Sequence, residues 1–231
     1  MSATPARLGV PAIAAAIGEP ARARMLFCLM DGRARTSTEL AIIAQVSAPT
    51  ASVHLSKLRA AKLVRTLPQG RNRFYSLQGQ EVAAALEALS VLAGAARAES
   101  SARIPVHLRL ARTCYDHVAG LLGVSWHDRL RSLEWLMLDE RTSSYELTDC
   151  GASGLAALGI DVGAVRAQRR RFACACCDWS ERRSHLGGAL GAALLQLALK
   201  HRWVQRHLDS RALSITRVGR RELHTRFGLE A

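Results

Sequence analysis

The stretch between residues 36 and 77 limits the possible folds more than any other part of this 231-residue chain. Thr36-Ser-Thr-Glu39 is a capping box that predicts the start of a short helix. Pro49 suits the first turn of a second helix. The segments 63–67 and 73–77 then resemble two strands joined by the turn PQGRN. The sequence therefore predicts a helix, a turn, a helix and a basic hairpin.

The second of these helices has one apolar face and one polar face. Ala51, Leu55 and Leu58 share the apolar side, and small or polar side chains occupy the other. A hydrogen-bonding face suits a helix that reads base edges in the major groove, while hairpin arginines suit phosphate or a narrow minor groove. This is the plan of a winged helix-turn-helix, although contact with phosphate alone, or a capping role for Ser47, stays open. We expect contacts with double-stranded DNA from Ser47, Thr50, Ser52, His54, Lys57, Arg71 and Arg73.

The charge of the chain favours an anionic partner. There are 32 lysines and arginines against 19 acidic residues, a formal net charge of +13, and most of the cations are arginine. Arginine binds phosphate through several N–H donors that lie in one plane. A general basic bias for solubility would give the same excess of basic over acidic residues. No apolar run reaches the roughly 18 residues of a membrane helix, and six cysteines in a chain of this length favour a reducing compartment. We expect a cytoplasmic protein without a membrane partner.

The sequence SAPTASVHLSKLRAAKLVRTLPQGRNRFYSL, which begins at Ser47, resembles the recognition helix and wing of the ArsR-type bacterial repressors. The resemblance covers residues 12–96. It implies a homodimer whose outer helices meet, which assigns residues 13–17 and 81–94 to the interface. Metal-sensing members of that family often carry cysteines in the first helix of the motif, or carboxylates and histidines in the final dimer helix. This chain has neither set of ligands.

The remainder of the chain is too long and too periodic to be a tail. We expect a DNA-binding and dimerisation domain at residues 1–97 and a small, polar linker at 98–104. Residues 105–231 are expected to form a mostly helical sensor domain. The fold class is therefore mainly α with small β-hairpins (α+β).

Within this C-terminal domain, two segments echo each other weakly. Residues 144–160 and 212–229 each contain an extended run that ends in Thr, followed by Gly and Leu at matching positions. The echo suggests that the domain contains winged-helix-like pieces. Periodicity predicts a hairpin at 203–216 and helices at 106–122, 127–138, 162–179 and 187–200.

Two segments of the C-terminal domain contain side chains that bind thiophilic metals. One is CYDH, which begins at Cys114, and the other is CACCDWSERRSH, which begins at Cys174. One thiol and one imidazole from each segment would suit zinc or another thiophilic divalent metal. The candidate residues for a metal or thiol-sensing site are Cys114, His117, Cys174, Cys176, Cys177, Asp178 and His185.

The spacing leaves open which sulfur faces Cys114. On a helix, Cys174 and Cys177 share a face and Cys176 points away. Similar CYDH and C-x-DWSER segments occur in longer ArsR-type proteins, and that resemblance favours Cys176. Three roles stay open: metal binding, thiol redox or persulfide sensing, and packing without a ligand. Nearby arginines would lower the thiol pKa.

The sequence thus predicts a sequence-specific DNA-binding transcriptional regulator, a repressor that responds to a metal, redox or small-molecule signal through its C-terminal domain. The effector itself is not specified by the sequence. One alternative is an architectural DNA-binding protein with little sequence preference. Another is an enzyme with a Cys/His pair as nucleophile and base, but no glycine-rich turn marks an oxyanion site, so we do not expect an enzyme.

Overall fold

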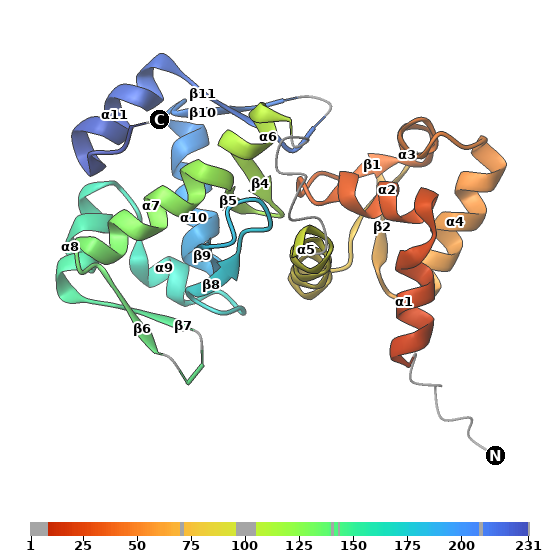
Figure 1. The fold of residues 1–231 in the computed structure, drawn as a ribbon, viewed down its shortest axis with the longest axis horizontal. Coiled ribbons are helices and arrows are strands. Elements are labelled where there is room, and N and C mark those ends of the chain that lie inside the picture. The colour runs from red at the N-terminus through yellow and green to blue at the C-terminus, as the bar shows by residue number, and fades with distance from the viewer. Residues whose placement is uncertain are drawn as a thin grey trace. The chain divides into compact units, whose positions relative to one another are not determined.

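The computed structural model describes residues 9–69, 72–95, 105–139, 141–142, 144–207 and 210–230. The chain divides into two compact units, Met1–Ala83 and Ala84–Ala231 (Figure 1). The division falls inside helix α5 (Gln80–Ala95). The domain boundary at residue 97 stays a prediction, and the predicted linker at 98–104 lies outside the described residues.

The N-terminal unit is a winged helix-turn-helix, as the sequence predicts. Its three-stranded antiparallel sheet has the order β1-β3-β2, and β2 and β3 form the hairpin of the wing. In chain order the elements before α5 are α1 (Val10–Gly18), α2 (Pro20–Leu29), β1 (Arg35–Thr36), α3 (Ser37–Ala44), α4 (Ala48–Ala60), β2 (Val64–Gln69) and β3 (Asn72–Leu77).

Local capping sets the positions of α3 and α4. The Thr36 side chain accepts a hydrogen bond from the Glu39 backbone, and the Glu39 carboxylate accepts one from the Thr36 backbone, which is the predicted capping box. Gln45 ends α3 in the left-handed conformation, and Ser47 caps the start of α4. The apolar face of α4 is buried, with Leu58 fully inaccessible, so its polar face is left toward solvent.

The C-terminal unit alternates short hairpins with helices (Figure 1). Its sheets are the pairs β4-β5 and β10-β11 and the four-stranded sheet β6-β7-β8-β9. After α5 the elements are α6 (Val106–Leu110), β4 (Arg112–Cys114), β5 (His117–Ala119), α7 (Gly120–Ser132), β6 (Leu136–Asp139), β7 (Ser144–Leu147), α8 (Asp149–Ala157), α9 (Val162–Arg166), β8 (Cys174–Cys177), β9 (Ser184–Gly187), α10 (Gly188–Lys200), β10 (Val204–Arg206), β11 (Leu213–Ile215) and α11 (Arg217–Phe227).

Three of the predicted helices are wrong in extent. The span 106–122 contains a short helix and then the β4–β5 hairpin, because Gly120 adopts φ +77°, a backbone conformation that a continuous helix does not allow. The span 162–179 is helical only in α9 and ends in strand β8, while 127–138 ends in strand β6. The helix at 187–200 and the hairpin at 203–216 are confirmed as α10 and as β10–β11.

The C-terminal unit contains the same structural plan twice. Its first repeat is β4-β5-α7-β6-β7-α8 and its second is β8-β9-α10-β10-β11-α11, each a hairpin, a helix, a hairpin and a helix. Equivalent residues such as His117 and His185 are 68 positions apart. The weak sequence echo belongs to the last strand and helix of each repeat.

Matching contacts support this equivalence. Thr148 and Thr216 cap α8 and α11, and each accepts a hydrogen bond of 2.9 Å from a glycine amide three residues later. The two repeats also exchange packing partners, since α7 lies against β9 and α10 lies against β5. Each helix therefore covers the hairpin of the other repeat, which brings the hairpins together.

None of the helices in the described ranges is long and apolar enough to span a lipid bilayer.

Candidate metal centre and DNA-binding surface

The two repeats bring four potential metal ligands together. Cys114 pairs with His117 across the β4–β5 hairpin, and Cys176 pairs with His185 across the β8–β9 hairpin. One ligand atom from each of these residues lies within 4.8 Å of the other three. Each repeat thus contributes one thiol and one imidazole to a single cluster, which we call the Cys2His2 cluster.

The dimensions of the Cys2His2 cluster suit a tetrahedral metal ion. The Sγ atoms of Cys114 and Cys176 are 3.9 Å apart, and the Nε2 atoms of His117 and His185 are 3.1 Å apart. Zinc bonds of about 2.3 Å to sulfur and 2.0 Å to nitrogen give tetrahedral edges of about 3.8 Å and 3.3 Å. Two thiolates would also neutralise a divalent ion, which allows it to be buried.

Glycines make room for the two histidines. A Cβ atom on Gly191 of α10 would lie 3.1 Å from the His117 Cβ atom and 2.3 Å from the Leu186 carbonyl. A Cβ atom on Gly123 of α7 would lie 3.5 Å from the His185 Cβ atom. Each helix therefore approaches the opposite hairpin through an equivalent glycine.

A carboxylate lies behind each imidazole. Asp116 Oδ1 is 3.2 Å from His117 Nδ1, and Asp178 Oδ2 is 3.3 Å from His185 Nδ1. Asp116 is held by Arg170. Metal-bound histidines commonly donate their second ring N–H to a carboxylate, which fixes the tautomer and orients the ring.

The two imidazoles face each other through their Nε2 atoms, and each has a carboxylate beside its Nδ1 atom. Because the two Nε2 atoms face each other, a direct hydrogen bond needs Nε2–H on one ring. Burial lowers the pKa of His117, but Cys114 and Asp116 outweigh it and raise the pKa to about 10. A protonated His117 donates to both Asp116 and His185, which leaves His185 Nδ1–H facing Asp178. A metal bound to both Nε2 atoms would leave an Nδ1–H on each ring, and both carboxylates would be satisfied.

The surroundings of Cys114, Cys174 and Cys177 favour the protonated thiol. The neighbouring Cys176 thiol and burial raise the pKa of Cys114 to about 12. Burial also raises the pKa of Cys174 and of Cys177. The expectation that nearby arginines lower these pKa values is therefore wrong, because burial outweighs them. A thiol with a raised pKa is a weak nucleophile, which argues against the Cys/His enzyme.

Strand geometry decides which sulfur faces Cys114. Cys174–Cys177 form β8, in which alternate side chains point to opposite sides of the strand. Cys176 joins the Cys2His2 cluster, whereas Cys177 is exposed and Cys174 lies apart, paired with Gly187. The interpretation that Cys174 and Cys177 share a helix face is wrong because the segment is a strand.

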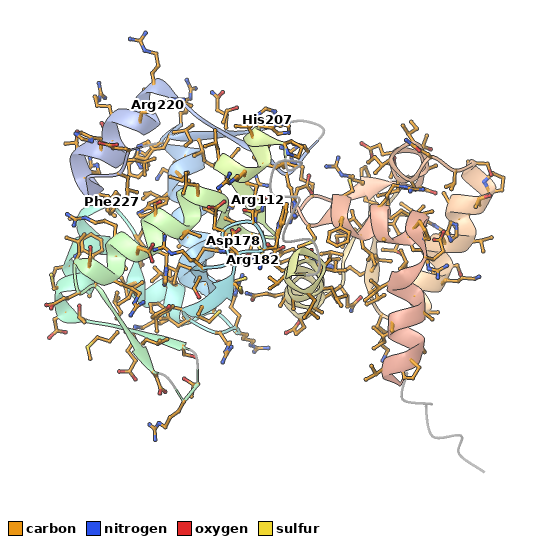
Figure 2. All side chains as sticks on the ribbon, in the orientation of Figure 1. Arg112, Asp178, Arg182, His207, Arg220 and Phe227 are labelled. Carbon is orange, nitrogen blue, oxygen red and sulfur yellow. The ribbon has the colours of Figure 1, made fainter. Side chains whose placement is uncertain are left out.

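Asp178 lies beside the cluster as a buried anchor for surrounding groups. Its Oδ2 accepts a hydrogen bond of 2.7 Å from the Gly120 amide, and its Oδ1 accepts one of 2.7 Å from Arg112. Figure 2 labels Arg112 and Asp178, which lie next to each other in the C-terminal unit. Burial alone would raise the pKa of Asp178, but His185 and Arg112 hold it well below the usual range.

Some residues around the ligands are not predicted from the sequence, namely Arg112 and the two spacing glycines. Aligning the two halves of the domain with each other would have found part of this set. Each half contains Cys-x-Asp, then His, then glycines three and six residues after that His.

Most of the predicted DNA-contacting residues lie on the exposed surface of the N-terminal unit. His54 differs, because it packs against the start of α2, with its Nδ1 3.4 Å from Arg22 and 3.6 Å from Glu19. Arg71 lies outside the described residues. The exposed candidates are Ser47, Thr50, Ser52, Lys57 and Arg73.

The fold and the exposed helix α4 define a DNA-binding regulator of the winged helix-turn-helix class. The family model described as bacterial regulatory protein, arsR family, matches residues 19–66. The uncharacterized HTH-type transcriptional regulator YdfF of Bacillus subtilis (strain 168) is 40% identical over 210 residues, 90% of this chain and 92% of that protein. The chain belongs to the arsR family of HTH-type transcriptional regulators.

Two solved structures are similar to parts of the chain. HlyU from Vibrio cholerae N16961 is 30% identical and covers 36% of this chain and 88% of its own, with a TM-score of 0.33. The cadmium metal-sensor CMTR from Mycobacterium tuberculosis is 32% identical and covers 35% of this chain and 82% of its own, with a TM-score of 0.31.

Proposed function

We propose that this regulator is a repressor whose affinity for operator DNA depends on a metal ion bound by the Cys2His2 cluster. The observation that carries the proposal is the meeting of Cys114, His117, Cys176 and His185 within 4.8 Å. Zinc, or another thiophilic ion that accepts tetrahedral sulfur and nitrogen ligands, fits this donor set. Four protein ligands close the coordination sphere, so the ion has no open position for catalysis.

The DNA partner follows from the N-terminal unit. Helix α4 would enter the major groove with Ser47, Thr50, Ser52 and Lys57, and the wing would hold phosphate with Arg71 and Arg73. A protein bound in this way occupies DNA that a polymerase needs, which makes repression the simplest output. In a reducing cytoplasm the thiols would stay available to the metal.

A homodimer would present two such helices to successive major grooves. The resemblance assigns residues 81–94 to the dimer interface, and Leu89 and Leu92 on that helix are 43% and 67% exposed in the single chain. Exposed leucines on an otherwise well-packed helix suit a surface that a second copy covers. Sedimentation of the purified protein tests this part, and a monomer at micromolar concentration would overturn it.

Metal binding is tested with zinc and with cobalt as a coloured substitute. We expect one ion per chain and the visible and near-ultraviolet absorption of tetrahedral cobalt with thiolate ligands. Cys176→Ser should weaken binding at least about tenfold, because it removes one of four ligands. Cys177→Ser is the matched control, since Cys177 is the exposed neighbour, and it should bind as the wild type does.

Regulation is tested on a duplex that the metal-free protein selects from a random DNA pool. Zinc should change the Kd for this duplex by at least about fivefold, the lower end of ordinary coupling between two sites. Equal affinities would overturn metal regulation. If the protein binds no zinc, but peroxide changes the Kd and links Cys114 to Cys176, thiol redox sensing replaces it.

A further inference from the structure

Beside the Cys2His2 cluster lies a buried group of charges that includes one residue of α5. Glu87 on α5 is 2% exposed, and its carboxylate lies 3.6 Å from Arg112 and 3.4 Å from Arg211. Both guanidinium groups also lie over the Trp179 ring, at 4.6 Å and 5.9 Å from its centroid. All of these residues belong to the C-terminal unit.

Arg112 connects Glu87 to the candidate metal ligands. Its side chain is fully buried and donates a hydrogen bond to Asp178, whose other oxygen lies 3.3 Å from His185. The contacts therefore run without a break from the metal ligand His185 through Asp178 and Arg112 to Glu87. Removing a charge from such a buried group leaves its neighbours with fewer partners, so the members hold one another in place.

We propose that this chain of contacts, Glu87–Arg112–Asp178, transmits metal occupancy to α5, an inference that rests on the proposed function. A metal bound at His185 Nε2 would fix that ring with its Nδ1–H directed at Asp178. Asp178 then holds the Arg112 guanidinium in one position, and Arg112 in turn holds the Glu87 carboxylate.

The position of α5 in the chain makes it a suitable receiver. Strand β3 of the wing ends at Leu77 and α5 begins at Gln80, so two residues separate the DNA-binding hairpin from the helix. A change in how well α5 is ordered, or in its direction, would therefore reach the wing through only two residues of backbone. Coupling of this kind needs two states of one element that both ligands influence, and α5 is that element.

The decisive variant is Glu87→Gln, which keeps the shape of the side chain and removes its charge. Glu222→Gln is the control, because Glu222 forms exposed ion pairs on α11 with Arg221 and Arg226. Three quantities are measured for each protein: zinc affinity by competition with a coloured chelator, Kd for the selected duplex without metal, and Kd with zinc. Glu87→Gln should keep zinc affinity within about threefold of wild type. The zinc-dependent change in its Kd should shrink from at least about fivefold to less than about twofold.

The outcomes separate this inference from the proposed function. A wild-type protein that binds no zinc, or whose DNA affinity ignores zinc, overturns both. If wild type responds and Glu87→Gln responds equally, only the inference is overturned. Should Glu87→Gln fail to fold, Arg211→Gln is judged by the same criterion, because Arg211 is nearer the surface and contacts the same carboxylate.

Amide hydrogen exchange of wild type gives a second, independent test. Zinc should slow exchange in residues 84–95 of α5, because Glu87 becomes better fixed. Unchanged exchange in that segment, together with protection of β5 and β9, would show that metal binding stops at the cluster. That result would also overturn the inference.

Discussion

The two cluster hairpins have the same role in their repeats but differ in how their carboxylates are held. Asp116 sits in the two-residue turn of β4–β5, its side chain is 23% exposed, and it meets Arg170 near the surface. Asp178 begins the longer loop of β8–β9, is fully buried, and meets Arg112. The first repeat thus holds its carboxylate near solvent. The second holds its carboxylate through the buried Arg112, which also contacts Glu87 on α5. The difference shows that equivalent positions diverge according to their neighbours.

The largest expected difference concerns the two carboxylates themselves. Asp178→Ala leaves Arg112 buried with a weakened set of partners and should lower the free energy of unfolding by about 3–5 kcal/mol. Asp116→Ala should cost about 1 kcal/mol, because Arg170 can reach water. Urea unfolding of both variants with zinc present checks this. Equal losses would mean that the two halves are equivalent after all.

The spacing glycines should behave alike in both repeats. Gly123→Ala and Gly191→Ala place a Cβ atom 2.4 Å and 2.3 Å from a backbone carbonyl oxygen. Each should cost about 3 kcal/mol, the upper end for overpacking, because backbone cannot move aside cheaply. Gly18→Ala is the control, since nothing lies within 4 Å of its Cβ position. If only one of the pair is sensitive in thermal unfolding, the repeats do not approach the cluster in the same way.

The first repeat contains a buried polar pair whose equivalent positions in the second repeat are apolar. His127 Nε2 and the Tyr145 hydroxyl are 2.7 Å apart, whereas the equivalent positions of the second repeat are Leu195 and Leu213. Burial lowers the pKa of His127 to about 4 from an ordinary 6.5, so the unfolded chain binds a proton more readily. The neutral His127 ring therefore makes its full contribution to the free energy of unfolding above pH 6.5. This contribution is lost as the pH falls toward 4.

As the pH falls from 7 to 5, the lowered pKa of His127 should reduce the free energy of unfolding by about 2 kcal/mol. His127→Gln has no titrating ring and should lose correspondingly less over the same interval. Urea unfolding at the two pH values measures the difference. Parallel losses in both proteins would place the pH sensitivity elsewhere.

The smallest effect is expected at a surface contact between the repeats. Arg183, in the loop between β8 and β9, pairs with Asp128 on α7, and its side chain is 62% exposed. Arg183→Ala should change the free energy of unfolding by less than about 0.5 kcal/mol, and added salt should remove the difference. A loss above 1 kcal/mol in urea unfolding at moderate salt would show that this loop contributes to joining the repeats.

The helix-turn-helix could be predicted because its signals are local. The capping box at Thr36, the cap at Ser47 and the alternating wing strands each act within a few residues, and all three are confirmed. The predicted helix at 106–122 is too long because the apolar residues of this span fit both the helical and the strand period. Helix α6 ends at Leu110 because Ala111 is extended and leads into the β4–β5 hairpin, and the left-handed Gly120 separates this hairpin from α7.

The sequence by itself determined the DNA-binding fold, the basic charge and the candidate ligand types. It also contained the echo of a duplication. The tertiary structure alone decided that Cys176, and not Cys177, joins Cys114, because adjacent residues of a strand point to opposite sides and the sequence had suggested a helix. It also decided the link from His185 to Glu87, since those contacts join residues far apart in the chain, and no local pattern records which buried charges will meet.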